Sequence, residues 1–309
     1  MIESVYLNQL EINKSHINDE VASFSKALLN HEASVLFFED WLKKERPELN
    51  PLHFGLLVYA SYKYAFVVGA GNEAASDWGE VIEVVNNKAD QVLAECLLTR
   101  SVNITNPYRY RSLALATKLV FGDAKISVAD IGCGFYPFGI GYQGNDMIPK
   151  TEDGKEVADY LGNYNRVEAV DLQNPDPIWT AACQWEPLNM MRSTAGLYRK
   201  LLDESEINFT KADMVSDPLK FEKVDAVFCA NILYQIPKEM RVKAMTNLRG
   251  ILKDNGKIIT ADFLPGGSRR RPFSYAIQAY KVSDVELSNG EVILVLENAD
   301  CMKVKSSTI

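Results

Sequence analysis

Apolar residues in the first third of the chain recur every three or four positions, and this spacing predicts helices. Residues 19–50 predict one or two amphipathic helices, and residues 76–100 predict a single long one. Between them, residues 55–71 form the most apolar stretch. Because Lys63 interrupts it and it is shorter than a membrane-spanning segment, we expect a buried core helix. The pattern predicts an all-helical domain over residues 1–106.

Beyond residue 106 the pattern changes to short apolar runs bounded by glycine, proline and asparagine, which predict strands. Helical spacing over residues 112–120 precedes the first run, and a helix over residues 237–252 precedes the last. This alternation predicts a doubly wound, mostly parallel α/β sheet in a nucleotide-binding domain over residues 107–309. The five predicted strands cover residues 128–131, 166–172, 207–214, 224–231 and 257–263.

The first predicted strand runs into a glycine turn. Gly132 and Gly134 allow a tight turn and a close approach of the backbone to a ligand. The dinucleotide fingerprint G-x-G-x-x-G would place a third glycine at position 137, where this chain has Pro137. No P-loop pattern follows any strand either. The turn therefore favours a nucleotide-like cofactor over a dinucleotide or a nucleoside triphosphate.

Acidic residues follow the next two strands. Asp171 ends the second strand, where a carboxylate can accept both hydroxyls of a ribose; the alternative is a loop aspartate that caps the next helix. Asp213 ends the third strand and could accept from an adenine amino group while Met214 packs on the ring. These positions predict a nucleoside site along one edge of the sheet.

Taken together, DIGCG, the acid after the second strand, AD after the third, ANILYQIP after the fourth and LKDNGKIITADF resemble class I S-adenosylmethionine-dependent methyltransferases over residues 108–263. The resemblance implies a seven-stranded sheet whose final antiparallel hairpin falls in residues 274–301. It also implies roles for single residues in holding S-adenosylmethionine. Asp130, Gly132 and Gly134 would face the methionine portion, Asp171 the ribose, Asp213 and Met214 the adenine, and Asn231 the methionine end.

The sequence departs from this family in two places. Asp171 follows Gly134 at a longer distance than is usual in the family, because residues 143–163 are an apparent insertion. The helix that normally precedes the hairpin has little room in residues 264–273, so we expect a remodelled edge.

The acceptor is expected beyond the fourth strand, where Tyr234 and Gln235 are the candidates for substrate contact. Tyr234 could act as the proton acceptor if its pKa is lowered; the alternative is a packing role. Tyr108 and Tyr110 could reach the sulfonium of the cofactor with their hydroxyls or rings, or could pack between domains. The predicted reaction is methyl transfer to a small-molecule acceptor.

Besides methyl transfer to a small molecule, or to RNA through a local basic patch, two other functions remain open. The segments NPYRYRSLALATKLV, GCGFYPFGI and GGSRRRPFSYAI are also similar to nicotianamine-synthase-like enzymes, which transfer the aminocarboxypropyl arm. That resemblance implies an amine acceptor and a carboxylate base on a front-domain helix, for which Asp77, Glu80 and Glu83 are available. The third possibility is a catalytically inactive protein that binds the cofactor as a scaffold.

The composition of the chain limits which ligands, metals and macromolecules we expect it to bind. With a net charge of −8 and a pI of about 5.1, the chain lacks the broad basic surface that nucleic acids require, although residues 109–111 and 268–271 could form a local basic patch. Arg269, Arg270 and Arg271 would suit an anionic acceptor. Five cysteines without a C-x-x-C pair and three histidines without ligand spacing predict no metal. With no signal-peptide pattern, we expect a cytoplasmic enzyme whose helical domain serves as a lid or in a homodimer.

Overall fold

The computed structural model describes residues 19–31, 44–47, 51–71, 73–102, 108–134, 164–184, 187–204, 207–230, 232–233, 236–263, 275–282, 290–296 and 304–307. The chain divides into two compact units. A helical unit comprises Met1–Ile104 and Asp176–Lys200, and a core unit comprises Thr105–Pro175 and Leu201–Ile309. The sequence assigned residues 176–200 to the second domain, whereas they group with the helices. Their buried apolar side chains, such as Trp179 and Ala181, explain this grouping.

The helical unit is assembled around α4 (Pro51–Gly69), which is buried along most of its length, as its apolar sequence predicts. The rings of Phe24, Tyr59, Tyr62 and Trp78 meet at centroid distances of 5.0 to 5.7 Å, partly edge to face. These rings form the centre of the unit. Its other helices with described bounds are α2 (Asp19–Asn30), α5 (Trp78–Lys88), α6 (Asp90–Thr99), α10 (Pro177–Ala182), the 3-10 turn η1 (Leu188–Met190) and most of α11 (Met191–Glu204).

The single long helix predicted over residues 76–100 is two helices, α5 and α6, separated at Ala89. Ala89 has φ −135° and is buried; a Cβ placed on Gly69 would lie 2.7 Å from its Cβ. The bend lets both α5 and α6 pack on α4. Tertiary packing therefore overrides the high helix propensity of alanine here.

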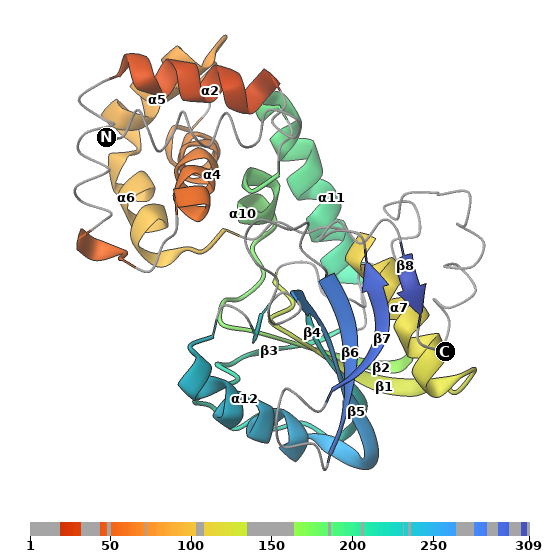
Figure 1. Cartoon of the computed structure of the whole chain (residues 1–309). Helices are drawn as coiled ribbons and strands as arrows, with labels where there is room; N and C mark the ends of the chain where they lie inside the picture. The colour runs from red at the N-terminus through yellow and green to blue at the C-terminus, as the bar shows by residue number, and fades with distance from the viewer. Residues whose placement is uncertain are drawn as a thin grey trace. The chain divides into compact units, whose positions relative to one another are not determined.

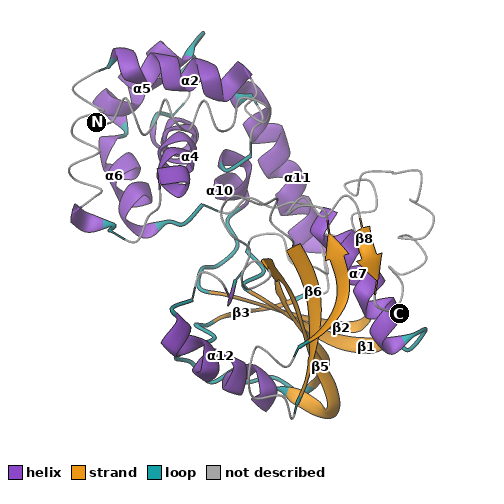
Figure 2. Cartoon of the chain, in the orientation of Figure 1, coloured by secondary structure: helices purple, strands orange, loops and turns teal. Residues whose placement is uncertain are grey.

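The core unit is an α/β sheet in which the described residues form eight strands in the order β3-β2-β1-β4-β5-β6-β7-β8 (Figures 1 and 2). The pairs from β3 to β5 are parallel, and those from β5 to β8 are antiparallel. The predicted doubly wound, mostly parallel fold and its final hairpin are confirmed, with β8 as a further edge strand. The strands are β1 (Ile126–Ile131), β2 (Tyr164–Asp171), β3 (Asn208–Lys211), β4 (Val224–Ala230), β5 (Leu252–Phe263), β6 (Tyr275–Lys281), β7 (Glu291–Leu296) and β8 (Val304–Ser307).

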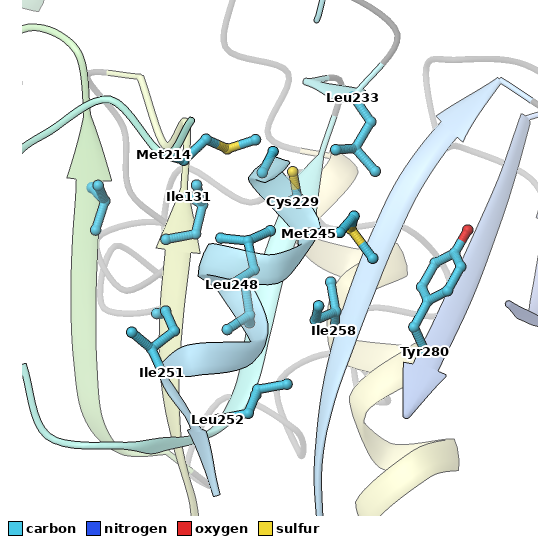
Figure 3. Packing of buried hydrophobic residues seen from close by; sticks show 14 of the residues in the cluster. Ile131, Met214, Cys229, Leu233, Met245, Leu248, Ile251, Leu252, Ile258 and Tyr280 are labelled. Atoms are coloured by element: carbon cyan, nitrogen blue, oxygen red, sulfur yellow. The ribbon is translucent and has the colours of Figure 1, made fainter. Parts of the chain in front are cut away.

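Helices cover both faces of this sheet: α12 (Lys238–Gly250) lies on one and α7 (Tyr108–Phe121) on the other (Figure 2). Under α12, the side chains of Met245 and Leu248 pack against Ile131, Cys229 and Ile258 of the central strands (Figure 3). All six residues of β1 are buried, as its short apolar run predicts for a central parallel strand. This packing fixes the carboxyl ends of β1, β2 and β4 as one rigid edge.

Among the described residues, no helix combines the length and apolar character needed to cross a bilayer. In the same part of the chain, no three histidine, cysteine or acidic side chains gather as a metal would need. The four described cysteines are buried free thiols.

Candidate cofactor site

The glycine turn after β1 is hydrogen-bonded to the end of β2. Gly132 and Gly134 have φ +62° and +63°, in the left-handed region that favours glycine. The amides of Gly132 and Cys133 donate to the carbonyl oxygen of Val170, at 2.8 and 3.2 Å. The turn is thus held by β2 as well as by its own strand.

Asp171 completes this arrangement. Its Oδ2 accepts from the amide of Gly134 at 2.7 Å, and its Oδ1 accepts from the amide of Gln173 at 3.3 Å. Gly134 and Asp171 are 37 positions apart in sequence, yet the parallel pairing of β1 with β2 brings them together. Since each carboxylate oxygen can accept more than one hydrogen bond, Asp171 can bind the turn and a ribose hydroxyl at once.

Ile232 explains why the first glycine of the turn has no side chain. A Cβ added to Gly132 would lie 2.4 Å from Cδ1 of Ile232 and 2.6 Å from its Cγ1. Ile232 follows β4, so the side chain that fills the space beside Gly132 comes from the strand next to β1. Sequence reasoning missed this residue, although an apolar residue directly after a strand was the available signal.

The central strands carry negative charge near their carboxyl ends. Burial raises the pKa of the Cys229 thiol, and the charges of Asp262 and Asp130 raise it further, so both carboxylates lie near this thiol. Asp130 is buried at 2% exposure, and Asp262 is half-buried near the end of β5. Asp130 and Asp262 are thus two acidic side chains near the carboxyl ends of the central strands. Asp262 was not among the residues predicted from the sequence.

Asp213 and Met214 take part in the turn after β3. The Oδ1 of Asp213 accepts from the Val215 amide at 2.8 Å, and its Oδ2 accepts from Oγ of Ser216 at 2.9 Å. Met214 is buried in the hydrophobic cluster beneath α12 (Figure 3). These contacts give both residues structural roles. Their contact with an adenine remains a prediction.

Leu172 is an exposed apolar residue beside Asp171, the acid predicted to bind the ribose. It directly follows Asp171, and 62% of its surface is exposed. An apolar side chain in this position offers a surface for a flat ring attached to the ribose. Sequence reasoning missed it because a single leucine after a strand is ordinary; its exposure is what marks it.

Glu80, one of the acids considered as a base, caps the helix α5. Its Oε2 accepts from the amide and from Oγ of Ser76, at 2.7 and 3.0 Å, while its own amide donates to Oδ1 of Asp77 at 3.0 Å. Glu83 is exposed on the same helix. Asp77 and Glu80 thus hold α5 at its N-terminus in the manner of a capping box.

The other predicted residues fall outside this geometry. Asn231, Tyr234, Gln235, Arg269, Arg270 and Arg271 lie outside the described residues. The backbone of Tyr108 and Tyr110 forms the start of α7, but their side chains are not among those described. The structure thus brings together Gly132, Gly134 and Asp171, with Asp130 two residues before Gly132.

No family model and no curated protein matches the sequence. Solved structures do match. NodS, an N-methyltransferase from Bradyrhizobium japonicum in complex with S-adenosyl-L-homocysteine, is 16% identical over 54% of this chain and 68% of its own, with a TM-score of 0.33. The 1,6-didemethyltoxoflavin-N1-methyltransferase from Burkholderia thailandensis, with 1,6-didemethyltoxoflavin and S-adenosylhomocysteine, is 18% identical over 54% of this chain and 56% of its own, with a TM-score of 0.31. Magnesium protoporphyrin IX methyltransferase from Synechocystis, with bound SAM, is 15% identical over 57% of this chain and 61% of its own, with a TM-score of 0.32.

Proposed function

We propose that the chain is an S-adenosylmethionine-dependent transferase that methylates a small-molecule acceptor. The observation that carries this proposal is the hydrogen bond between the Gly134 amide and the Asp171 carboxylate, which joins a glycine turn to an acid at the ends of two adjacent parallel strands. Ligands of open α/β sheets bind at this edge of the strands. The glycine turn accommodates the close approach of the cofactor, and the acid accepts its ribose hydroxyls.

Three features favour S-adenosylmethionine over a dinucleotide. Pro137 stands where the dinucleotide fingerprint has its third glycine. Asp130 and Asp262 supply negative charge for the sulfonium and ammonium groups, whereas a pyrophosphate would be repelled. Leu172 gives the adenine an apolar surface next to the ribose carboxylate. Asp213, Met214 and Asn231 remain further candidates for contact with the cofactor.

S-adenosylmethionine supplies an electrophilic methyl carbon on sulfur. When bound, the cofactor would offer this carbon to the acceptor's lone pair and would keep the electron pair of the broken carbon–sulfur bond on its sulfur. The chain contributes positioning, exclusion of water and removal of the acceptor's proton. We assign the last role to Tyr234, with Gln235 as a neighbouring substrate contact and Tyr108 and Tyr110 beside the sulfonium.

Binding of S-adenosylhomocysteine, measured by isothermal titration calorimetry, tests the cofactor assignment. Hydrogen bonds to a charged group contribute about 1.5–3 kcal/mol, so Asp171→Ala should weaken binding roughly 10- to 150-fold. Asp254→Ala is the matched control, because Asp254 is an exposed carboxylate near the start of β5, at the opposite end of the strands from Asp171. Equal affinity of wild type and Asp171→Ala would exclude this site.

Analysis of the nucleoside product tests the reaction. After incubation with S-adenosylmethionine and an extract of small metabolites, S-adenosylhomocysteine would support methyl transfer. Methylthioadenosine would instead identify transfer of the aminocarboxypropyl arm to an amine, and Glu80→Gln and Glu83→Gln would then test the proposed base. Cofactor binding with neither product would support a scaffold. If the acceptor is anionic, alanine at Arg269, Arg270 and Arg271 should raise its KM.

A further inference from the structure

Arg100 of the helical unit is held by three side chains at once. Its guanidinium carbon lies 4.4 Å from the ring centroid of Tyr64 and 5.0 Å from that of Trp179. Its Nη1 donates to Oδ2 of Asp176 at 2.7 Å, and its Nη2 donates to Oη of Tyr64 at 3.0 Å. The hydroxyl of Tyr64 in turn donates to the same Oδ2 at 3.2 Å. A guanidinium bound in its plane and stacked on both aromatic residues is fixed in one orientation.

Asp176 also begins the helix α10. Its Oδ1 accepts from the amides of Ile178 and Trp179, at 3.0 Å each, while its Oδ2 receives Arg100. Nε1 of Trp179 donates to the carbonyl oxygen of Ser101 at 3.0 Å, so the helix is fastened on this side by a backbone contact as well. We call Tyr64, Arg100, Asp176 and Trp179 the α10 clasp.

The other end of α10 is anchored separately. Lys63, which is fully buried, donates from Nζ to the carbonyl oxygen of Gln184 at 3.0 Å, and lies 5.0 Å from the ring centroid of Tyr59. Removal of this anchor would loosen the same helix without touching the clasp. The chain therefore contains a matched control for any effect of the clasp.

The clasp lies next in sequence to the ribose carboxylate. Only Leu172, Gln173, Asn174 and Pro175 separate Asp171 from Asp176. The first end of this connection is bound to the glycine turn through Gly134, and the second is bound to Arg100. Each end is held within its own unit: the contacts of Asp171 and of Asp176 order the residues where the connection begins and ends, so only four residues remain to be ordered when a ligand binds.

We propose that the α10 clasp is a positioning device for cofactor binding: the Arg100–Asp176 ion pair sets the connection that presents Asp171 and Leu172 to the nucleoside. The inference rests on the proposed function. Arg100 does not touch the cofactor in this scheme; it acts through Asp176 and the four-residue connection. Because coupling between two sites is reciprocal, bound cofactor must also stabilise the clasp.

Calorimetric titration with S-adenosylhomocysteine tests the proposal in Arg100→Met and Asp176→Asn. The asparagine keeps an oxygen for the amides of Ile178 and Trp179 and removes only the ion pair. We expect the Kd to rise at least ~5-fold in both variants. In Lys63→Met the thermal midpoint should fall while the Kd stays within about 2-fold of wild type, because only the far anchor is lost.

Fluorine NMR of protein labelled with 5-fluorotryptophan gives the reciprocal readout. The Trp179 resonance, assigned by its loss in Trp179→Phe, should shift when S-adenosylhomocysteine binds. The resonance of Trp78, buried in the aromatic centre of the same unit, should not. In Asp176→Asn the ligand concentration at which the shift is half complete should rise by the same factor as the calorimetric Kd.

The outcomes separate this inference from the function on which it rests. Wild-type protein that fails to bind S-adenosylhomocysteine would overturn the proposed function, and the clasp's role with it. Wild-type binding with unchanged Kd in Asp176→Asn would overturn the clasp alone. If Arg100→Met does not fold, Asp176→Asn decides. An equal loss of affinity in Lys63→Met would show a general effect of helix stability and would also overturn the proposal.

Discussion

The replacement Gly132→Ala tests the geometry of the glycine turn most directly. Two effects act at this position. The backbone has φ +62°, where a side chain is disfavoured, and a Cβ would lie 2.4 Å from Cδ1 of Ile232. Gly122 separates the two effects, because it has the same φ of +62° but a Cβ added there would have no atom within 4 Å.

The expected magnitudes follow from these distances. The left-handed conformation costs an alanine about 1–2 kcal/mol, which is the whole effect expected in Gly122→Ala. Overpacking against Ile232 adds about 1–3 kcal/mol, so Gly132→Ala should lower the unfolding free energy by about 2–5 kcal/mol. In Gly132→Ala/Ile232→Ala the added methyl has room. The double variant should therefore be more stable than the sum of the two single changes predicts.

Urea-dependent hydrogen exchange, followed by mass spectrometry on peptides that cover β1 and β4, measures the unfolding free energy of the core unit. Calorimetry with S-adenosylhomocysteine on the same variants measures the cofactor site. We expect Gly132→Ala to lose affinity and Gly122→Ala to keep it, because Gly122 follows α7 and lies before β1. If the two alanine variants are within about 0.5 kcal/mol of each other, or if Ile232→Ala gives no relief, the steric argument is wrong.

Three further results are expected. Although burial opposes ionisation, hydrogen bonds from Lys253 and Ser127 hold the pKa of Asp225 below its ordinary value. The stability that this carboxylate contributes is present above the unfolded pKa of about 3.9 and is lost as pH falls through the lower folded pKa. The loss of unfolding free energy in Asp225→Asn, measured by urea unfolding, should therefore shrink below about pH 4. Leu172→Ala should weaken S-adenosylhomocysteine binding by about 1–2 kcal/mol, roughly 5- to 30-fold, whereas Val242→Ala, at 58% exposure, should leave the Kd unchanged. Burial raises the pKa of Cys96 to about 12 and also raises that of Cys229, so in Cys301→Ser the thiol reagent DTNB at pH 8 should react only upon unfolding; rapid labelling would contradict the described burial.

The pairing of Gly134 with Asp171 could be predicted because it depends on chain order. A buried strand before each residue and parallel pairing place both at one edge of the sheet, whatever the length between them. The apparent insertion between them leaves this register intact, with Ile131 opposite Val170. Local periodicity and topology were sufficient for this part of the site.

Other features needed contacts that no local pattern carries. From the sequence alone, Asp176 looks like an ordinary N-terminal cap of the following helix. Its partners Arg100 and Tyr64 are 76 and 112 positions away. Ala89 favours a helix by itself, but the helix ends there where it packs on α4. Strand β8, VKSS, has too short a pattern to predict a strand; it is assigned by its pairing with β7. In each case a distant partner decided the outcome.

The helical unit is made of two separated segments of the chain, so it cannot fold completely until the second segment has been synthesised. Its first segment ends at Ile104 and its second at Lys200, so 200 − 104 = 96 further residues must leave the ribosome before the unit is complete. At roughly 5–20 residues per second this delay is about 5–19 s. Until then the surface of α4 that packs on α10 has no cover from Trp179 and its neighbours. We therefore expect the helical segment of nascent chains that stop near residue 104 to depend on chaperones, and the helical unit to fold without them once residue 200 has left the ribosome.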